Sequence, residues 1–267
     1  HYVFLHPLPK SYICPLMSQR YFVELSYDGT PFHGWQIQQN AKSIQQTLNE
    51  ALSTVIRHQI YVIGCGRTDT GVHAKKFIAH FDCPLVLDQV KDIMFRVNCV
   101  LPKEIALHQL RQSKPEFHSR FDATSRTYEY FISKVKNPFT MMRAHEYRES
   151  LDIDVMNEAC KALFEYKDFT SFAKLHGDAE TNLCDIHRAK WSSSGNKIIF
   201  HVAANRFLRN MVRAMVGTLI EVGRKKITVD EFRSIIESKD RSKAGYSVPA
   251  HGLYLVDISY PPETGIA

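Results

Sequence analysis

Several protein classes are excluded by what the sequence lacks. None of its six cysteines forms a C-x-x-C pair, which structural zinc sites usually need. Six cysteines in 267 residues are also too sparse for a disulfide scaffold. We therefore expect reduced, mostly buried thiols. Glycine (12) and proline (11) are too few for a collagen-like or low-complexity chain. No stretch approaches the roughly 18 apolar residues that a membrane-spanning helix needs.

The remaining composition is ordinary for a globular protein. Hydrophobic residues make up 44% and charged residues 23%, which supplies a core and excludes intrinsic disorder. The net charge of +6 is mild, so it permits an anionic partner without requiring one. A length of 267 residues suggests one large domain or two small ones.

The first sixteen residues differ from the rest. They begin with histidine, hold three of the eleven prolines, and carry Lys10 as their one charge. They do not have the basic segment and apolar run of a secretory signal. Met17 with Ser18 and Gln19 resembles a natural start. We interpret residues 1–16 as a non-native or upstream leader, outside the fold.

The periodicity of apolar residues predicts two halves that mix strands and helices. Helix starts are marked by Ser43, with Gln46 at capping-box spacing, by Asp152, and by Thr228 with Glu231. The predicted strands are 20–27, 60–63, 76–82, 104–110, 126–135, 186–193, 197–203 and 253–259. The predicted helices start after Ser43, cover 88–99, start at Asp152, cover 206–222 and start at Thr228.

The pattern is interrupted near residues 112–118, where Lys114-Pro115 stands. We therefore predict an α+β protein with subdomains at 17–113 and 114–262, and a tail at 263–267. The strands are too short and too closely spaced for a doubly wound parallel sheet.

A glycine-rich segment between two predicted strands contains a candidate catalytic carboxylate. Three of the twelve glycines fall within residues 64–71, which lets a ligand approach the main chain. Arg67 and Asp69 are two residues apart, so in an extended loop they project to the same side. A carboxylate beside a guanidinium stays ionised and can act as a nucleophile or a base. The alternative is a turn aspartate that only pairs with a neighbour.

Asp69-Thr70-Gly71 also matches the aspartic protease motif. That chemistry needs two carboxylates that share one proton. The chain has no second Asp-Thr-Gly or Asp-Ser-Gly, and its long predicted helices do not suit a mostly β protease. The protease alternative is therefore disfavoured.

A basic segment and an aromatic strand add a candidate surface for nucleic acid. Arg206, Arg209 and Arg213 are spaced to share one side of the predicted helix. Residues 205–226 hold six basic side chains and one acidic, a local net charge of +5; a solvated helix face is the alternative. Gly217 costs about 1 kcal/mol relative to alanine in a helix, so we interpret it as a close packing contact. Tyr128 could stack on a nucleobase or be a core tyrosine.

Together these segments resemble the tRNA pseudouridine synthase A family. The resemblance covers about residues 18–262. Its motifs are Tyr27-Asp28-Gly29, Gly34-Trp35-Gln36, the run from Gly66 to Ala74 (GRTDTGVHA), Arg126-Thr127-Tyr128, the run from Phe207 to Arg213 (FLRNMVR), and Gly252-Leu253-Tyr254-Leu255.

The resemblance implies two RRM/ferredoxin-like subdomains whose antiparallel sheets join across a central basic cleft. It implies isomerisation of uridine to pseudouridine at positions 38, 39 and 40 of the tRNA anticodon stem-loop. Members act as homodimers without a cofactor or metal, so we expect tRNA and a second copy as partners, no membrane, and a cytoplasmic location.

The resemblance also implies catalytic residues. Asp69 matches the essential aspartate, which could attack C1′, attack C6, or assist loss of the 2′ proton; sequence does not choose among these. Arg213 matches the arginine that pairs with the aspartate and keeps it ionised. Tyr128 matches the tyrosine that stacks on the target base and takes part in proton transfer.

Substrate-binding residues follow in the same way. Arg67 matches the arginine that helps to extrude the nucleotide and hold phosphate, and Leu253 matches the apolar pocket wall. Arg206 and Arg209 are expected to contact the RNA. The alternative function is a non-catalytic RNA-binding module or tRNA chaperone, for which the basic segment and Tyr128 would suffice. Phosphate binding alone, however, does not need Asp69.

Overall fold

The structure is a computed structural model that describes residues 18–174 and 181–266. The predicted leader, residues 1–16, lies outside the described residues. The strands are β1 (Gln19–Tyr27), β2 (Ile63–Gly64), β3 (His73–Cys83), β4 (Ile105–Gln112), β5 (Ser125–Ser133), β6 (His145–Glu146), β7 (Ile186–Ser194), β8 (Lys197–Ala204) and β9 (Leu253–Ser259). The helices are α1 (Ile44–Ile56), α2 (Val90–Val100), α3 (Ile153–Ala162), α4 (Met211–Gly223) and α5 (Val229–Glu237), with short 3-10 turns η1 (Thr170–Phe172), η2 (Ala250–Gly252) and η3 (Pro262–Thr264).

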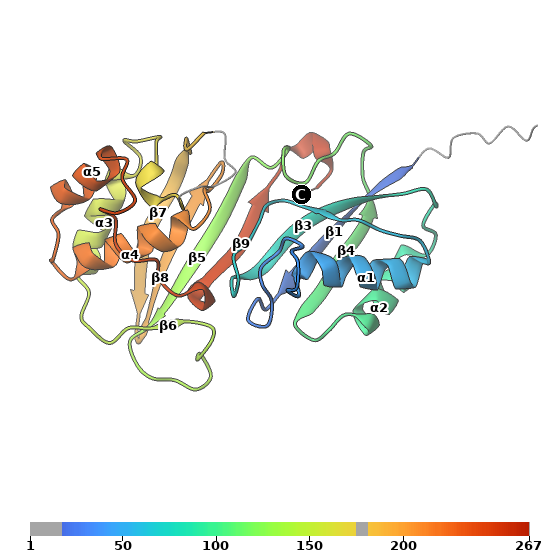
Figure 1. Ribbon diagram of the computed structural model, residues 1–267, viewed down its shortest axis with the longest axis horizontal. Coiled ribbons are helices and arrows are strands. Elements are labelled where there is room, and N and C mark those ends of the chain that lie inside the picture. Colours follow the sequence, from blue (N-terminus) through green and yellow to red (C-terminus); the bar gives the residue numbers. More distant parts are fainter. Residues whose placement is uncertain (1–17, 175–180, 267) are drawn as a thin grey trace, which may run out of the picture.

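The strands form one open sheet in the order β4-β1-β3-β9-β5-β8-β7, with β2 paired to β3 and β6 to β5. The pairs are antiparallel except β3 with β9 and β5 with β6. Helices α1 and α2 lie at one end of the sheet, and α3, α4 and α5 at the other (Figure 1). The mixed α and β architecture with a mostly antiparallel sheet confirms the predicted class at this level.

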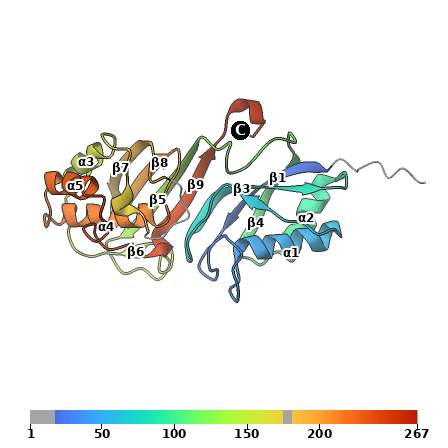
Figure 2. The ribbon, with the colours of Figure 1, turned by 45° about the horizontal axis from the view of Figure 1, so that its top comes forward.

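Strand β9 joins the two ends of the sheet, as Figure 2 shows. It pairs in parallel with β3 through His73 opposite Tyr254 and Ala74 opposite Leu255, and antiparallel with β5. Two apolar clusters flank this junction. Leu255 packs in the cluster with α1 and α2, whereas Leu253 packs in the cluster with α3, α4 and α5. The last strand therefore fixes both cores to each other.

Most predicted elements are observed to within a few residues. Ser43 Oγ accepts a hydrogen bond from Gln46 N at 3.2 Å, but the Gln46 side chain donates to Glu50, so only half of that capping box forms. The box of Thr228 and Glu231 is complete. The predicted strand 60–63 was wrong, since only Ile63–Gly64 is a strand.

The helix predicted over 206–222 was also wrong at its start. Asn210 has a φ of 65°, a left-handed conformation that an α-helix does not continue through. The helix therefore starts at Met211. Arg206 and Arg209 precede it and do not share a helix face with Arg213.

The cysteine prediction is confirmed within the part of the chain that the structure describes. Cys65, Cys83, Cys160 and Cys184 are buried free thiols, and Cys99 is an exposed one; Cys14 lies outside the described residues. Within residues 18–174 and 181–266, no helix combines the length and apolar character needed to cross a bilayer. The same residues hold no group of three or more side chains arranged to bind a metal ion.

Candidate active site

Asp69 lies on the loop that joins β2 to β3. The residue before it, Thr68, is buried. Its hydroxyl is 2.9 Å from the Tyr27 hydroxyl, and its carbonyl accepts a hydrogen bond from Trp35 N at 3.2 Å. Arg67 is exposed, and the Asp69 side chain keeps 28% of its surface accessible. The loop is thus anchored at Thr68 while both flanking side chains reach solvent.

The turn after β1 packs directly against this loop. A Cβ on Gly29 would lie 2.0 Å from the carbonyl oxygen of Val72. A Cβ on Gly34 would lie 2.4 Å from the Thr68 carbonyl oxygen, and Gly34 has a φ of +82°, which favours glycine. These glycines let two backbone segments approach more closely than any side chain permits.

Two arginines converge on the Asp69 carboxylate. Arg213 Nη1 is 3.5 Å from Oδ2, and Arg209 Nε is 3.9 Å from Oδ1. Arg213 lies in the first turn of α4, whereas Arg209 lies in the loop before it. The two guanidinium groups place positive charge beside both oxygens of the carboxylate. A partly exposed, ionised carboxylate of this kind can act as a nucleophile or a base.

Arg213 is held in place by the segment that follows α5. Its Nε donates to the Val248 carbonyl at 2.7 Å, and Val248 N donates back to the Arg213 carbonyl at 3.2 Å. The segment lies so close to α4 that a Cβ on Gly217 would be 1.8 Å from the Tyr246 carbonyl oxygen. The interpretation of Gly217 as a close packing contact is confirmed.

Tyr128 in β5 packs against both apolar clusters. The rings of Tyr128 and Phe207 pack edge to face, with their centroids 5.2 Å apart. Burial raises the pKa of Tyr128, and the nearby Cys65 and Asp69 groups raise it further. The hydroxyl therefore stays protonated at neutral pH and can donate a hydrogen bond.

The other predicted residues, Leu253 and Arg206, lie in β9 and in the loop before α4. Leu253 is buried at the start of β9, opposite Tyr130 of β5. Arg206 is half-buried. Its charge lowers the pKa of the Cys184 thiol, which burial raises. Burial raises the pKa of the Cys65 thiol to about 12, which leaves it uncharged, as expected of a packing residue.

Comparison with known proteins decides the family. A family model described as tRNA pseudouridine synthase matches residues 159–261. The tRNA pseudouridine synthase A of Parabacteroides distasonis is 51% identical over 245 residues, which cover 92% of this chain and 97% of that protein. The protein of the same name from Bacteroides thetaiotaomicron is 52% identical over 248 residues (92% of each chain), and that from Bacillus subtilis is 36% identical over 240 residues (88% and 97%). The chain belongs to the tRNA pseudouridine synthase A family.

In this family member, sequence reasoning missed a second network beside the Asp69 loop. His73 Nδ1 accepts a hydrogen bond from Gly29 N at 3.1 Å, and its Nε2 donates to the His251 carbonyl at 3.1 Å. Burial lowers the pKa of His73, against the charge of Asp28. A neutral His73 thus links the end of the loop to η2. Its presence in the motif was the available signal, but the motif gave no role for it.

Arg126 is the second missed residue. Nη1 donates to the carbonyls of Ala123 and Asn205, both at 2.7 Å. Nη2 donates to the carbonyls of Arg120 and Cys65, at 2.6 and 3.1 Å. One guanidinium therefore ties three loops together, including the loop that carries Asp69. Its position in the Arg126-Thr127-Tyr128 motif was the signal.

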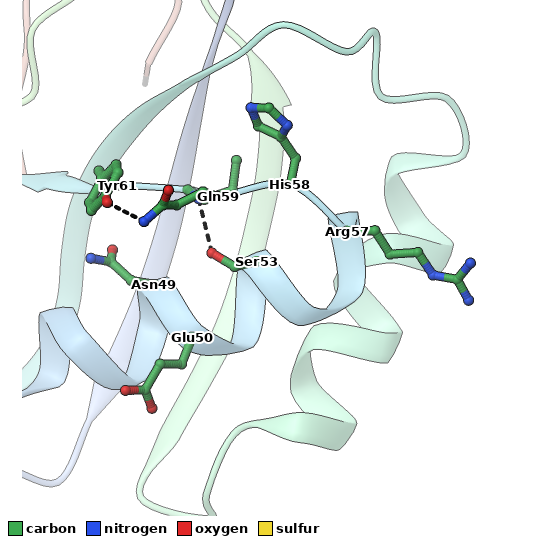
Figure 3. A pocket seen from close by; sticks show the side chains of 8 residues that line it. Asn49, Glu50, Ser53, Arg57, His58, Gln59 and Tyr61 are labelled. Carbon is green, nitrogen blue, oxygen red and sulfur yellow. Dashed lines mark hydrogen bonds between the residues drawn. The ribbon is translucent and has the colours of Figure 1, made fainter.

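Among the described residues of this synthase-family chain, two hollows have linings that do not include Asp69. One, of about 450 Å³, is at the end of α1 and is lined by Asn49, Glu50, Ser53, Arg57, His58, Gln59, Ile60 and Tyr61. Its polar groups bond to one another, as Figure 3 shows: Ser53 Oγ accepts from Ile60 N at 2.9 Å, and Gln59 bonds to Tyr61. The other, of about 240 Å³, lies over β1, β3 and β9. The candidate site is therefore identified by the charged groups that converge on Asp69, and not by the volume of a hollow.

Proposed function

We propose that this protein isomerises uridine to pseudouridine in tRNA, with Asp69 as its catalytic carboxylate. Besides family membership, one observation carries this proposal: the ionised carboxylate of Asp69 lies between Arg209 and Arg213 on a loop held by its backbone. The reaction breaks the N1–C1′ bond, turns the uracil and joins C5 to C1′. C5 loses a proton and N1 gains one, so the atoms balance without a redox partner.

The catalytic roles follow from charge. Asp69 acts on C1′, on C6, or on the 2′ proton, and the geometry supports each of these routes because each needs an ionised carboxylate. Arg213, fixed by Val248, maintains that ionisation. Tyr128 stacks on the target base and takes part in proton transfer; its hydroxyl is protonated at neutral pH, because burial raises its pKa.

The substrate-binding roles follow from exposure and position. A target base inside a stem must be extruded before it can react, at a cost of a few kcal/mol. Arg67, Arg206 and Arg209 carry the charge that holds phosphates around the extruded nucleotide, and Leu253 forms the apolar wall of the pocket.

The finer expectations are part of the same proposal. The substrate positions are 38, 39 and 40 in the anticodon arm, and the enzyme acts in the cytoplasm as a homodimer. The proposed RRM-like subdomains are residues 17–113 and 114–262, with a tail at 263–267. The apolar clusters cross these bounds, since Phe117 and Ile266 pack with α1 and α2 and Val72 packs with α3, α4 and α5. Strand β9 contributes to both clusters and pairs with both β3 and β5, which would keep the two subdomains in a fixed relation.

The direct test is to incubate the protein with unmodified tRNA transcripts in the presence of a chelator and to map pseudouridine by position. We expect product at position 38, 39 or 40. Binding without any product, with the uridines intact, would instead support the non-catalytic RNA-binding module.

A further inference from the structure

Phe121 is an aromatic side chain held outside both apolar clusters. It lies in the connection between β4 and β5, residues 113–124, which crosses the top of the molecule in Figure 1. Its side chain is 74% exposed. Exposure of a large apolar ring to water is unfavourable, and a planar ligand that covered the ring would relieve it.

The loop around Phe121 is firmly anchored. Ser119 is fully buried, its Oγ donates to the Ile63 carbonyl at 2.7 Å, and its carbonyl accepts from the Tyr260 hydroxyl at 2.6 Å. His118 N donates to Asp122 Oδ2 at 2.8 Å. These hydrogen bonds fix the loop in a conformation that leaves Phe121 exposed.

The immediate neighbours of Phe121 are suited to nucleic acid. Its ring centroid lies 4.3 Å from that of His118, with the planes 32° apart. The guanidinium of Arg120 lies 5.6 Å from the Phe121 ring. An aromatic ring beside an arginine is the combination that binds unpaired bases with little dependence on sequence, because every base has a π-face.

The Phe121 loop is also joined to the catalytic loop. Ser119 bonds to Ile63, and Arg126 Nη2 bridges the carbonyls of Arg120 and Cys65. Cys65 precedes Asp69 by four residues. Arg126 therefore ties the loop that carries Phe121 to the loop that carries Asp69.

We propose that Phe121 and Arg120 form a stacking site for an unpaired nucleobase of the tRNA, distinct from the site of the target uridine. The ring stacks on the base and the guanidinium neutralises an adjacent phosphate. This inference rests on the proposed function, because it takes tRNA as the ligand.

The test compares binding of an unmodified tRNA transcript by Phe121→Ala, Phe121→Leu and Phe121→Trp. Loss of the π-face in the alanine and leucine variants should weaken binding by roughly ten- to a hundredfold, whereas tryptophan should preserve it. Phe95 on α2 is also exposed, at 67%, so Phe95→Ala is the matched control and should bind like the unaltered protein. Trp35 and Trp191 are both buried, so quenching by tRNA would report on the introduced tryptophan.

Three results would overturn the inference. The first is that the alanine and leucine variants bind tRNA within twofold of the unaltered protein. The second is that tRNA leaves the emission of the tryptophan variant unchanged. The third is a loss of binding that accompanies a change in the molecular mass of the protein, which would indicate a subunit contact. Binding is measured without turnover. An unaltered protein that binds tRNA but makes no pseudouridine would therefore defeat the proposed function alone, and an active protein with unaffected Phe121 variants would defeat this inference alone.

Discussion

Arg213 Nη1, in the first turn of α4, lies 3.5 Å from Asp69 Oδ2, although the two residues are more than 140 positions apart in the chain. The same guanidinium uses its Nε to reach the Val248 carbonyl. One side chain therefore contacts both the carboxylate and the segment that follows α5.

Arg213→Lys should separate these two duties. A lysine keeps the charge but offers a single nitrogen, which cannot reproduce the planar fork. We expect kcat for pseudouridine formation to fall on the order of a hundredfold, with little change in the Kd for tRNA. Arg233→Lys is the control, since Arg233 pairs with Glu165 and has no part in the site. Equal losses of kcat in both variants would contradict the assignment.

Arg126→Lys should destabilise the protein. Four carbonyls lose their shared donor, and polar groups left without partners cost about 1–3 kcal/mol in the free energy of unfolding. Urea titration measures this cost. Arg111→Lys on β4 is the comparison, because the Arg111 guanidinium donates to one side chain, that of Gln109, and lies over Phe22. An unchanged unfolding midpoint for Arg126→Lys would show that the tie is dispensable.

Gly217→Ala should destabilise the protein although alanine is the better helix former. The new Cβ would lie 1.8 Å from the Tyr246 carbonyl oxygen, so backbone must move, at a cost of about 1–3 kcal/mol. The intrinsic helix preference, about 1 kcal/mol, is outweighed. Gly66→Ala is the stability control, since a Cβ there meets no atom within 4 Å. A higher melting temperature for Gly217→Ala would be the contrary result.

His80 should make the protein less stable in acid. Burial lowers its pKa to about 4, aided by Arg20 and His118 and opposed by Asp82 and Asp122. Its Nδ1 accepts a hydrogen bond from Ser119 N at 3.2 Å, and among the described residues its Nε2 is buried with no hydrogen-bond partner. Protonation would therefore place a proton on the nitrogen that accepts this bond. The unfolded chain, with a His pKa near 6.5, binds the proton more tightly.

The stabilising contribution of His80 is consequently complete above about pH 6.5 and is lost as pH falls toward its folded pKa of about 4. The expected loss is about 2 kcal/mol. Urea titrations across this window should show a shallower decline for His80→Gln than for the unaltered protein. Identical declines would remove His80 as a cause.

Local sequence signals predicted much of the fold, and the failures have physical causes. Ser43 and Thr228 mark helix starts through short-range hydrogen bonds, so they are visible in sequence. The start of α4 was misplaced because the apolar pattern continues upstream of Asn210, whose left-handed conformation is set by its surroundings. The parallel pairing of His73 with Tyr254 depends on residues far apart in the chain and leaves no local signal.

The candidate site shows the same division. Asp69 and Arg213 were predicted as partners from motifs, and the structure places them within ion-pair distance. Arg209 reaches Asp69 from a loop instead of a helix. Arg213 is positioned by the backbone carbonyl of Val248. Every residue type has such a carbonyl, so the residue type at position 248 does not predict this contact.

The most direct measurement concerns Asp69 itself. Asp69→Asn keeps the size of the side chain and removes its charge. In a single-turnover experiment with unmodified tRNA, we predict that this variant forms no detectable pseudouridine while binding the tRNA within a few-fold of the unaltered protein. Pseudouridine formed at the unaltered rate would contradict the assignment of Asp69 as the catalytic carboxylate, and loss of tRNA binding would show that its role is structural.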